Sequence, residues 1–138
     1  MAEWKVNEGP NVDMDQLRQL YESAPWAKGR TADDIKRMLE NTDYVFSVQD
    51  GETLVGFARV LTDKVYRATL WDVIAHPARQ GQGIGEALLK AIVSHPVLSR
   101  VDRLWLNTHE KFRFYERFGF VRSDQGMIRD RTGGRGPS

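Results

Sequence analysis

The stretch Trp71–Leu89 reads WDVIAHPARQGQGIGEALL, and it is the most informative segment of this 138-residue chain. An apolar run ends at a His-Pro pair, three glycines alternate with other residues (Gly81, Gly83, Gly85), and apolar residues of helical period follow. This order predicts a strand, a turn and a helix. Glycines at such a turn let backbone N–H groups approach a ligand, and the N-terminus of a helix attracts anions. The stretch therefore predicts a phosphate site, although a tight strand-to-helix turn would explain the glycines equally well.

The letters of this turn exclude two common phosphate-binding loops. The dinucleotide fingerprint G-x-G-x-x-G/A would need a third small residue where the chain has Glu86 or Leu88. The P-loop pattern G-x-x-x-x-G-K-[ST] occurs nowhere in the chain. The segment Gln80-x-x-Gly83-x-Gly85 instead resembles the Q/R-x-x-G-x-G/A loop of the GNAT acetyltransferase superfamily, which cradles the pyrophosphate of acetyl-CoA.

A second motif strengthens this resemblance. Residues 114–120 read FYERFGF and are similar to the superfamily signature F/L-Y-x-x-x-G-F. The resemblance is good over residues 44–124. Within the superfamily, the chain is similar to small single-domain bacterial members and to cyanobacterial and plant serotonin (arylalkylamine) N-acetyltransferases. It implies an α/β (α+β) GNAT fold, a mixed and mostly antiparallel sheet with helices on both faces, in the order β-α-α-β-β-β-α-β-α-β(-β).

The rest of the chain has patterns that agree with this order. Capping boxes at Asp13 and Thr31 predict two short helices, Asp50-Gly51 predicts a hairpin turn, and Pro96 predicts the end of the helix that begins at Gly83. Strands are expected at 4–7, 44–49, 54–61, 68–75 and 101–108, a helix at 110–117, and a last hairpin at 120–123 and 127–129. We expect residues 1–130 to form a single domain and residues 131–138 a disordered tail.

Composition excludes several classes of protein. Forty-one per cent hydrophobic and 28% charged residues are ordinary globular values. No cysteine is present, which excludes disulfides, thiolate metal sites and a cysteine nucleophile, and the three histidines have no ligand spacing, so we expect no metal. The net charge of +1 argues against nucleic acid as a partner. A signal sequence and a long apolar run are both absent, which predicts a cytoplasmic protein with no membrane partner.

The resemblance assigns cofactor contacts residue by residue. Backbone groups of Val73, Ile74 and Ala75 would meet the pantetheine arm of acetyl-CoA, in the manner of an added strand. Arg79 beside the loop would either meet a CoA phosphate or be solvated. Thr108 would donate one hydrogen bond to the pantetheine or to a water. The pyrophosphate would be held by the loop and the first turn of the helix: Gln80, Gly81, Gln82, Gly83, Ile84, Gly85 and Glu86.

The catalytic assignment implied by the resemblance is Tyr115, whose phenol would protonate the departing thiolate. The alternative is an amphipathic tyrosine at the edge of the core. Many relatives carry Asn where this chain has Thr108, and plant-type enzymes tend to carry Asp; a threonine cannot act as a base. Asp72, Glu110 or His109 acting through water remain candidates for the base, and Asp72 could equally be a hydrogen-bonded structural carboxylate.

The acceptor pocket is expected to include Trp26 and Asp72. An aromatic lining suits an aryl-alkyl or cationic amine, although aromatic residues at such spacings more often belong to the core. The leading hypothesis is an acetyl-CoA-dependent N-acetyltransferase acting on a primary amine of a small molecule, such as an arylalkylamine or polyamine, by direct attack in a ternary complex. The alternatives are a protein lysine or N-terminal acetyltransferase and a non-catalytic CoA-binding domain. A homodimer is left open.

Overall fold

The structure is a computed structural model that describes residues 3–131. The chain splits into two units, Met1–Leu106 and Asn107–Ser138. Within the described part, the first unit contains strands β1 (Val6–Glu8), β2 (Tyr44–Asp50), β3 (Thr53–Thr62), β4 (Arg67–Ala75) and β5 (Arg103–Trp105). It also contains helices α1 (Met14–Glu22), α2 (Ala32–Glu40) and α3 (Ile84–Val93), and the 3₁₀ turns η1 (Pro25–Ala27), η2 (Pro77–Arg79) and η3 (Leu98–Arg100). The second unit contains helix α4 (Phe112–Glu116).

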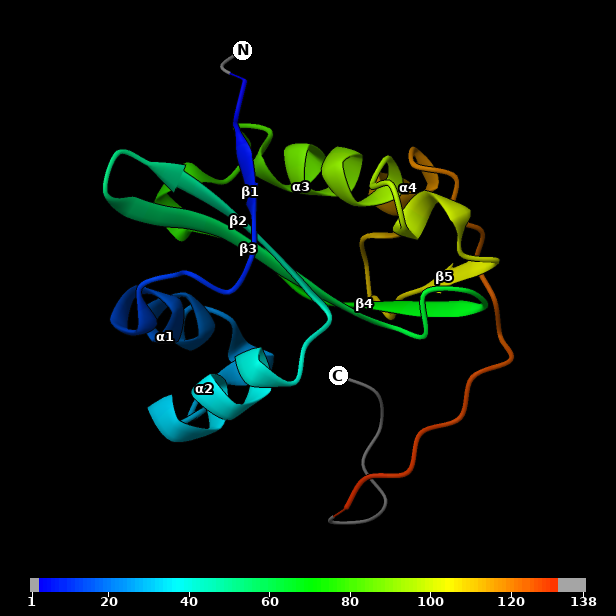
Figure 1. The fold of residues 1–138 in the computed structure, drawn as a ribbon, viewed down its shortest axis with the longest axis horizontal. Coiled ribbons are helices and arrows are strands. Elements are labelled where there is room, and N and C mark those ends of the chain that lie inside the picture. Colours follow the sequence, from blue (N-terminus) through cyan, green and yellow to red (C-terminus); the bar gives the residue numbers. More distant parts are fainter. Residues whose placement is uncertain (1–2, 132–138) are drawn as a thin grey trace. The chain divides into compact units, whose positions relative to one another are not determined.

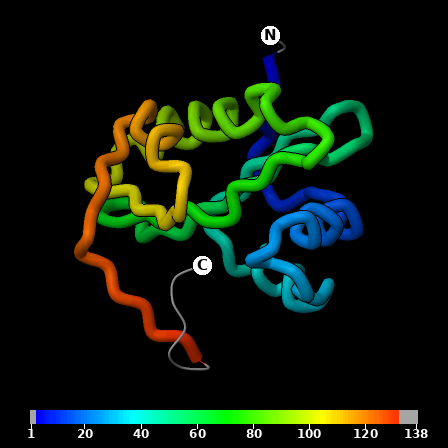
Figure 2. The backbone as a smooth tube through the Cα atoms, turned by 180° about the vertical axis from the view of Figure 1, so that it is seen from behind, coloured from blue at the N-terminus to red at the C-terminus, as the bar shows by residue number. Residues whose placement is uncertain are grey.

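The strands of the first unit form one sheet in the order β1-β2-β3-β4-β5. Three neighbouring pairs are antiparallel, and β5 runs parallel to β4 because α3 carries the chain back across the sheet between them. Helix α3 covers one face, while α1 and α2 lie against the other (Figure 1). The view from behind shows the same two layers of helices (Figure 2). The expected mixed sheet with helices on both faces is thus confirmed.

Local signals account for the helices and the first hairpin. The Asp13 carboxylate accepts a hydrogen bond from the Gln16 N–H at 3.0 Å, and the Thr31 hydroxyl accepts one from the Asp34 N–H at 3.2 Å. The predicted N-caps of α1 and α2 are thus present. The reciprocal half of the first capping box is not formed, because the Gln16 side chain donates to the Glu52 carbonyl and accepts from the Leu54 N–H instead. Gly51 turns the β2–β3 hairpin with a φ of +61°, a value that favours glycine.

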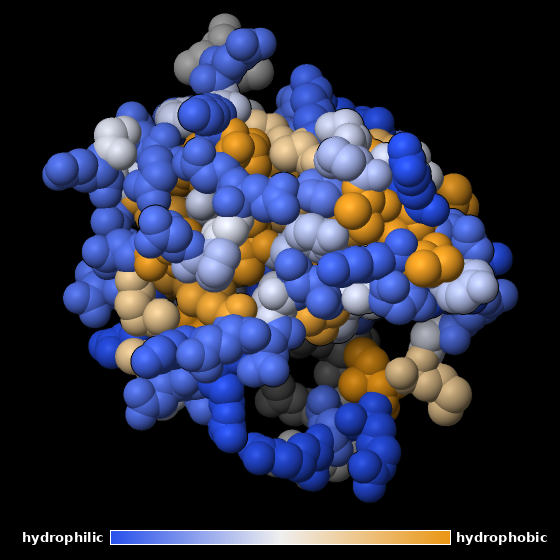
Figure 3. Space-filling view, viewed as in Figure 1, coloured by the Kyte–Doolittle hydropathy of each residue, from blue (hydrophilic) through white to orange (hydrophobic). Residues whose placement is uncertain are grey.

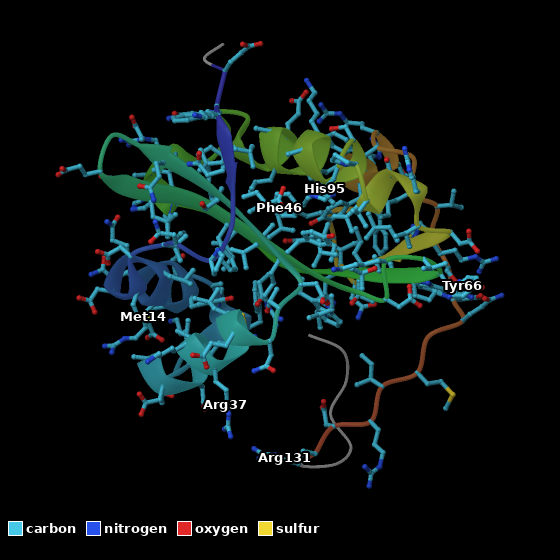
Figure 4. The ribbon with its side chains drawn as sticks, in the orientation of Figure 1. Met14, Arg37, Phe46, Tyr66, His95 and Arg131 are labelled. Atoms are coloured by element: carbon cyan, nitrogen blue, oxygen red, sulfur yellow. The ribbon has the colours of Figure 1, made fainter. Side chains whose placement is uncertain are left out.

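Apolar side chains fill both sides of the sheet. Leu17, Tyr21 and Ile35 of α1 and α2 pack with Leu54 and Phe57 of β3 in one buried cluster. On the other face, the Phe46 ring lies edge-on to the His95 imidazole, with ring centroids 5.8 Å apart (Figure 4). Helix α3 comes close to the sheet at Gly56, where an added Cβ would lie 2.5 Å from Cγ2 of Ile84. Hydrophilic side chains cover most of the surface seen in Figure 3.

A β-bulge interrupts the pairing of β3 with β4. Phe57 pairs with Ile74, whereas Arg59 pairs with Trp71, so β4 carries one more residue than β3 over this interval. Asp72 lies in the bulge with a φ of +56°, which few non-glycine residues adopt. A bulge turns a strand locally and re-aims its side chains.

The structure corrects the expected elements at both ends of the chain. The first strand begins at Val6 rather than at residue 4, the strand expected at 101–108 is reduced to Arg103–Trp105, and α4 is shorter than expected. The hairpin expected at 120–123 and 127–129 is wrong: residues 117–131 form neither strand nor helix. Three of its apolar side chains are exposed, Val121 at 88%, Met127 at 98% and Ile128 at 52%, so strand pairing would bury little apolar surface there. Of the expected tail, 132–138 lie outside the described residues.

No helix among the described residues is both long and apolar enough to cross a membrane.

Candidate functional site

The loop between β4 and α3 has the backbone conformation that its glycines predict. Gly81 has a φ of +80° and Gly83 a φ of +87°, both in the left-handed region. An added Cβ at Gly81 would meet no atom within 4 Å. Gly83 is the N-cap of α3 and makes no side-chain cap, so its absent side chain leaves the N–H groups of the first turn uncovered. This loop can hold an anion through backbone N–H groups.

The indole of Trp4 holds one peptide of this loop. Its Nε1 donates a hydrogen bond to the carbonyl oxygen of Gln82 at 2.8 Å. The C=O and N–H of a trans peptide point in opposite directions. The bond therefore directs the N–H of Gly83 away from the indole. Sequence reasoning missed Trp4, because its partner lies 78 residues along the chain and no local pattern connects them.

Arg79 is neither free nor simply solvated. Its guanidinium pairs with the Asp50 carboxylate at the tip of the β2–β3 hairpin, with Nε 3.1 Å and Nη2 3.0 Å from Oδ2. Both side chains are partly exposed, so the pair adds little to stability. Arg79 ties the loop to the hairpin.

One edge of β4 lacks a strand partner just before the loop. Within residues 3–106, β5 pairs with β4 only at Arg67, Ala68 and Thr69. The other edge continues its pairing with β3 as far as Ala75. The stretch that contains Val73, Ile74 and Ala75 therefore presents backbone N–H and C=O groups on the β5 side. An extended ligand with amide groups could add to this edge as a strand would.

Asp72, next to that edge, is the centre of a buried polar cluster. Its Oδ2 accepts hydrogen bonds from Arg59 Nε at 2.6 Å, from the Tyr21 hydroxyl at 2.8 Å and from Arg30 Nη1 at 3.0 Å. The Asp72 side chain is only 3% exposed. Burial, followed by the neighbouring Asp72 carboxylate, raises the pKa of Tyr21, so its hydroxyl stays protonated and donates. Three donors within the protein thus engage Oδ2 of Asp72, which favours a structural role over that of a base.

Arg30 contacts both Asp72 and Trp26, the two residues expected at the acceptor pocket. Its guanidinium carbon lies 4.6 Å from the centroid of the Tyr21 ring and 5.6 Å from that of the Trp26 ring. Trp26 is 46% exposed and forms part of η1, in the loop between α1 and α2. Sequence reasoning missed Arg30, Arg59 and Tyr21. A charged residue inside the apolar strand segment GFARV was the available signal for Arg59.

The remaining candidates belong to the second unit. Tyr115 lies on α4 and contacts the rings of Phe114 and Phe120, at centroid distances of 5.0 and 5.9 Å. Burial raises the pKa of Tyr115 to about 12. The Thr108 hydroxyl accepts a hydrogen bond from the Lys111 N–H at 3.1 Å and so helps to begin α4.

The predicted site residues thus fall into two groups. Val73–Ala75, Gln80–Glu86, Asp72 and Trp26 belong to the first unit, and Thr108 and Tyr115 to the second. The two other candidates for the base, His109 and Glu110, are exposed residues of the second unit.

Two further features of the described residues concern ligand binding. Among residues 3–131, no group of three or more His, Cys, Asp or Glu side chains could hold a metal ion. A cavity of about 190 Å³ lies between α1 and the start of β3, and its lining includes Gln16, Gln19, Leu20 and His76 but none of the predicted site residues.

Comparison with known proteins agrees with this geometry. The sequence model of the acetyltransferase (GNAT) family matches residues 11–120. An uncharacterized N-acetyltransferase ycf52 from Pyropia yezoensis is 29% identical over 127 residues, covering 88% of this chain and 72% of the relative. The histone acetyltransferase TAP1 of Glycine max is 27% identical over 131 residues, covering 86% of this chain and 56% of the relative. A crystal structure from Xanthomonas campestris, described as belonging to the GNAT family, superposes with a TM-score of 0.80 at 28% identity, covering 91% of this chain and 93% of that one.

The family match spans the β4 edge, the glycine loop and the F-Y-x-x-x-G-F segment alike, and the fold agrees with that of a solved member. The chain therefore belongs to the GNAT family and is an acetyltransferase.

Proposed function

We propose that this acetyltransferase transfers an acetyl group from acetyl-CoA to the primary amine of a small molecule, by direct attack in a ternary complex. The observation that carries the proposal is the edge of β4 that has no strand partner within residues 3–106 and leads directly into the glycine loop. The GNAT family uses acetyl-CoA, and the edge and the loop suit the two polar parts of that molecule. We also propose that residues 1–130 act as one catalytic domain, since the family match spans both units.

Each part of CoA finds chemically suitable groups on the first unit. Backbone groups of Val73, Ile74 and Ala75 would pair with the amides of the pantetheine arm. Backbone N–H groups from Gln80 to Glu86 would hold the pyrophosphate, helped by the positive end of the α3 dipole. The left-handed conformations of Gly81 and Gly83 support this role, because they turn the loop without placing a Cβ on its surface.

Acetyl-CoA supplies the acetyl group as a thioester; the amine nitrogen forms the new C–N bond, the C–S bond breaks, and CoA leaves as the thiol. The sequence contains no cysteine that could carry the acetyl group between substrates. Tyr115 would donate its phenolic proton to the sulfur, and Thr108 would contact the pantetheine or a water. A pKa of about 12 keeps that phenol protonated throughout the neutral range. Glu110 or His109 acting through water would take the proton of the amine.

A protein acceptor is the main alternative, since one relative is named a histone acetyltransferase. That relative is longer, and this chain spans 56% of it. The loop between α1 and α2 is short here and carries the exposed Trp26, which suits a small amine better than a polypeptide. As a separate point, we propose that the reaction takes place in the cytoplasm.

An acceptor panel tests the proposal. We expect at least one small amine to show a kcat/KM about tenfold or more above that of lysine peptides, measured by release of the CoA thiol from acetyl-CoA. The panel holds arylalkylamines, polyamines, amino acids, a histone-tail peptide and a peptide with a free N-terminus. A peptide acceptor that exceeds every small amine would reverse the assignment.

Binding of CoA through the glycine loop is tested with Gly85→Val. Gly85 lies in the first turn of α3 and lacks a positive φ, so the variant adds bulk at the pyrophosphate site with little backbone strain. We expect CoA to bind at least about tenfold more weakly, a loss of about 1.4 kcal/mol, in isothermal titration calorimetry. The matched control is Gly126→Val, where an added Cβ meets no atom within 4 Å. Equal affinities for the two variants would remove the loop from the CoA site.

A further inference from the structure

The cluster around Asp72 carries one excess positive charge. Arg30 and Arg59 each form an ion pair with Asp72, at 3.0 and 2.6 Å, and the third donor, Tyr21, is neutral. The carboxylate of Glu22 lies in the same region, since it accepts a hydrogen bond from the N–H of Gly29. Glu22 is exposed, however, so water screens its charge. Two cations thus share one buried anion.

Arg30 has N–H groups that Asp72 does not engage, and two aromatic rings flank its guanidinium. Asp72 engages its Nη1, while the guanidinium carries further N–H groups in a fork that matches a carboxylate. Its side chain is 34% exposed, against 15% for Arg59, so Arg30 is the arginine that a ligand can reach. The rings of Tyr21 and Trp26 fix its orientation, which lowers the entropy lost on binding.

The cluster is placed next to the strand edge that would hold the thioester arm. Asp72 directly precedes Val73–Ala75 in β4, and the bulge turns its side chain toward α1 and the loop that follows α1. An acceptor whose amine approaches that edge from the side of Trp26 would pass the guanidinium of Arg30.

From these observations, and resting on the proposed function, we infer that Arg30 forms an anion subsite and that the preferred acceptors are amines that also carry a carboxylate. The carboxylate would accept hydrogen bonds from the free N–H groups of Arg30, while the exposed indole of Trp26 covers the apolar part of the acceptor. Polyamines, whose charges are all positive, would be repelled by the excess charge of the cluster.

The test compares acceptors that differ only by a carboxylate: tryptophan with tryptamine, and ornithine with putrescine. We expect the carboxylate member of each pair to have a kcat/KM at least about tenfold higher, because only that member can accept charge-assisted hydrogen bonds from the guanidinium of Arg30. Raising the salt from about 0.05 M to about 0.5 M should reduce this ratio in the wild-type protein. The salt series needs no variant, so it remains decisive if an Arg30 variant fails to fold.

Arg30→Gln should bring the ratio close to one, and Arg30→Lys should restore part of it, because a lysine keeps the charge but loses the planar fork. The matched control is Arg37→Gln on α2, an exposed arginine that points away from the sheet (Figure 4). Circular dichroism and the dissociation constant of CoA verify that each variant is folded.

The outcomes separate this inference from the proposed function. Acetylation of small amines without a carboxylate preference, or with a preference that Arg30→Gln leaves intact, overturns the anion subsite alone. Acetylation of peptides only, or of nothing while CoA still binds, overturns the proposed function and the subsite with it.

Discussion

Replacing Tyr115 by phenylalanine is expected to lower kcat by about 100-fold and to leave the affinity for acetyl-CoA within about threefold. The phenolic proton matters when negative charge builds on the departing sulfur, so its contribution belongs to the transition state. A 100-fold loss corresponds to about 2.7 kcal/mol, which is reasonable for a single proton donor. Steady-state kinetics and calorimetry measure the two quantities.

The pKa of Tyr115 predicts how this effect depends on pH. The pKa is raised to about 12, so the phenol remains protonated below about pH 11, and no alkaline loss of activity at pH 8–10 should arise from it. The advantage of wild type over Tyr115→Phe should therefore be constant across that range. It should also shrink with an acetyl thioester of a more acidic thiol, which needs its proton less. A phenylalanine variant with near-native turnover, where the chemical step limits kcat, would make Tyr115 a packing residue only.

The second large effect is expected at Asp72 and concerns stability. Asp72→Asn should lower the free energy of unfolding by about 3 kcal/mol, because it leaves the largely buried guanidinium of Arg59 without a counter-charge. Asparagine tolerates the left-handed conformation at φ +56°, so this variant tests the charge alone. Asp72→Ala should cost more, since alanine also strains the bulge. Urea denaturation monitored by circular dichroism gives both values.

The control for this prediction is Asp102→Asn, a change at an exposed carboxylate that should alter stability by less than about 0.5 kcal/mol. If Asp72→Asn were no more damaging than this control, the cluster would have to behave as a solvated ion pair. Arg30 would then be free to move, and its preorganisation for an anion would be lost.

Features that depend on neighbouring residues were predictable from the sequence. The caps at Asp13 and Thr31, the turn at Gly51 and the glycine loop each follow from a few consecutive letters, and all appear as expected. The hairpin expected at 120–123 and 127–129 is wrong because that prediction rested on local sequence alone. A few apolar residues around Gly126 imitate a strand pattern, but a strand also needs a partner edge and a buried face, which local letters do not report.

The candidate site also depends on contacts between residues that are distant in the sequence. Trp26 and Asp72 were both expected at the acceptor pocket, yet what connects them is Arg30, which carries no local signal. The bulge depends on a one-residue offset between β3 and β4, and no pattern within either strand reveals an offset between them. Motifs can thus identify the glycine loop of a GNAT protein, whereas the cluster of Arg30, Arg59 and Asp72 depends on tertiary contacts.

The hydrogen bond from Trp4 to Gln82 joins the first described residues of the chain to the glycine loop. An indole whose N–H is engaged by a carbonyl responds in its fluorescence when that carbonyl moves. Trp4 is therefore an intrinsic fluorescent probe of the glycine loop, provided that its emission is separated from that of the three other tryptophans of the chain. For the same reason, an affinity tag joined just ahead of Trp4 could disturb the loop while leaving every motif of the sequence intact.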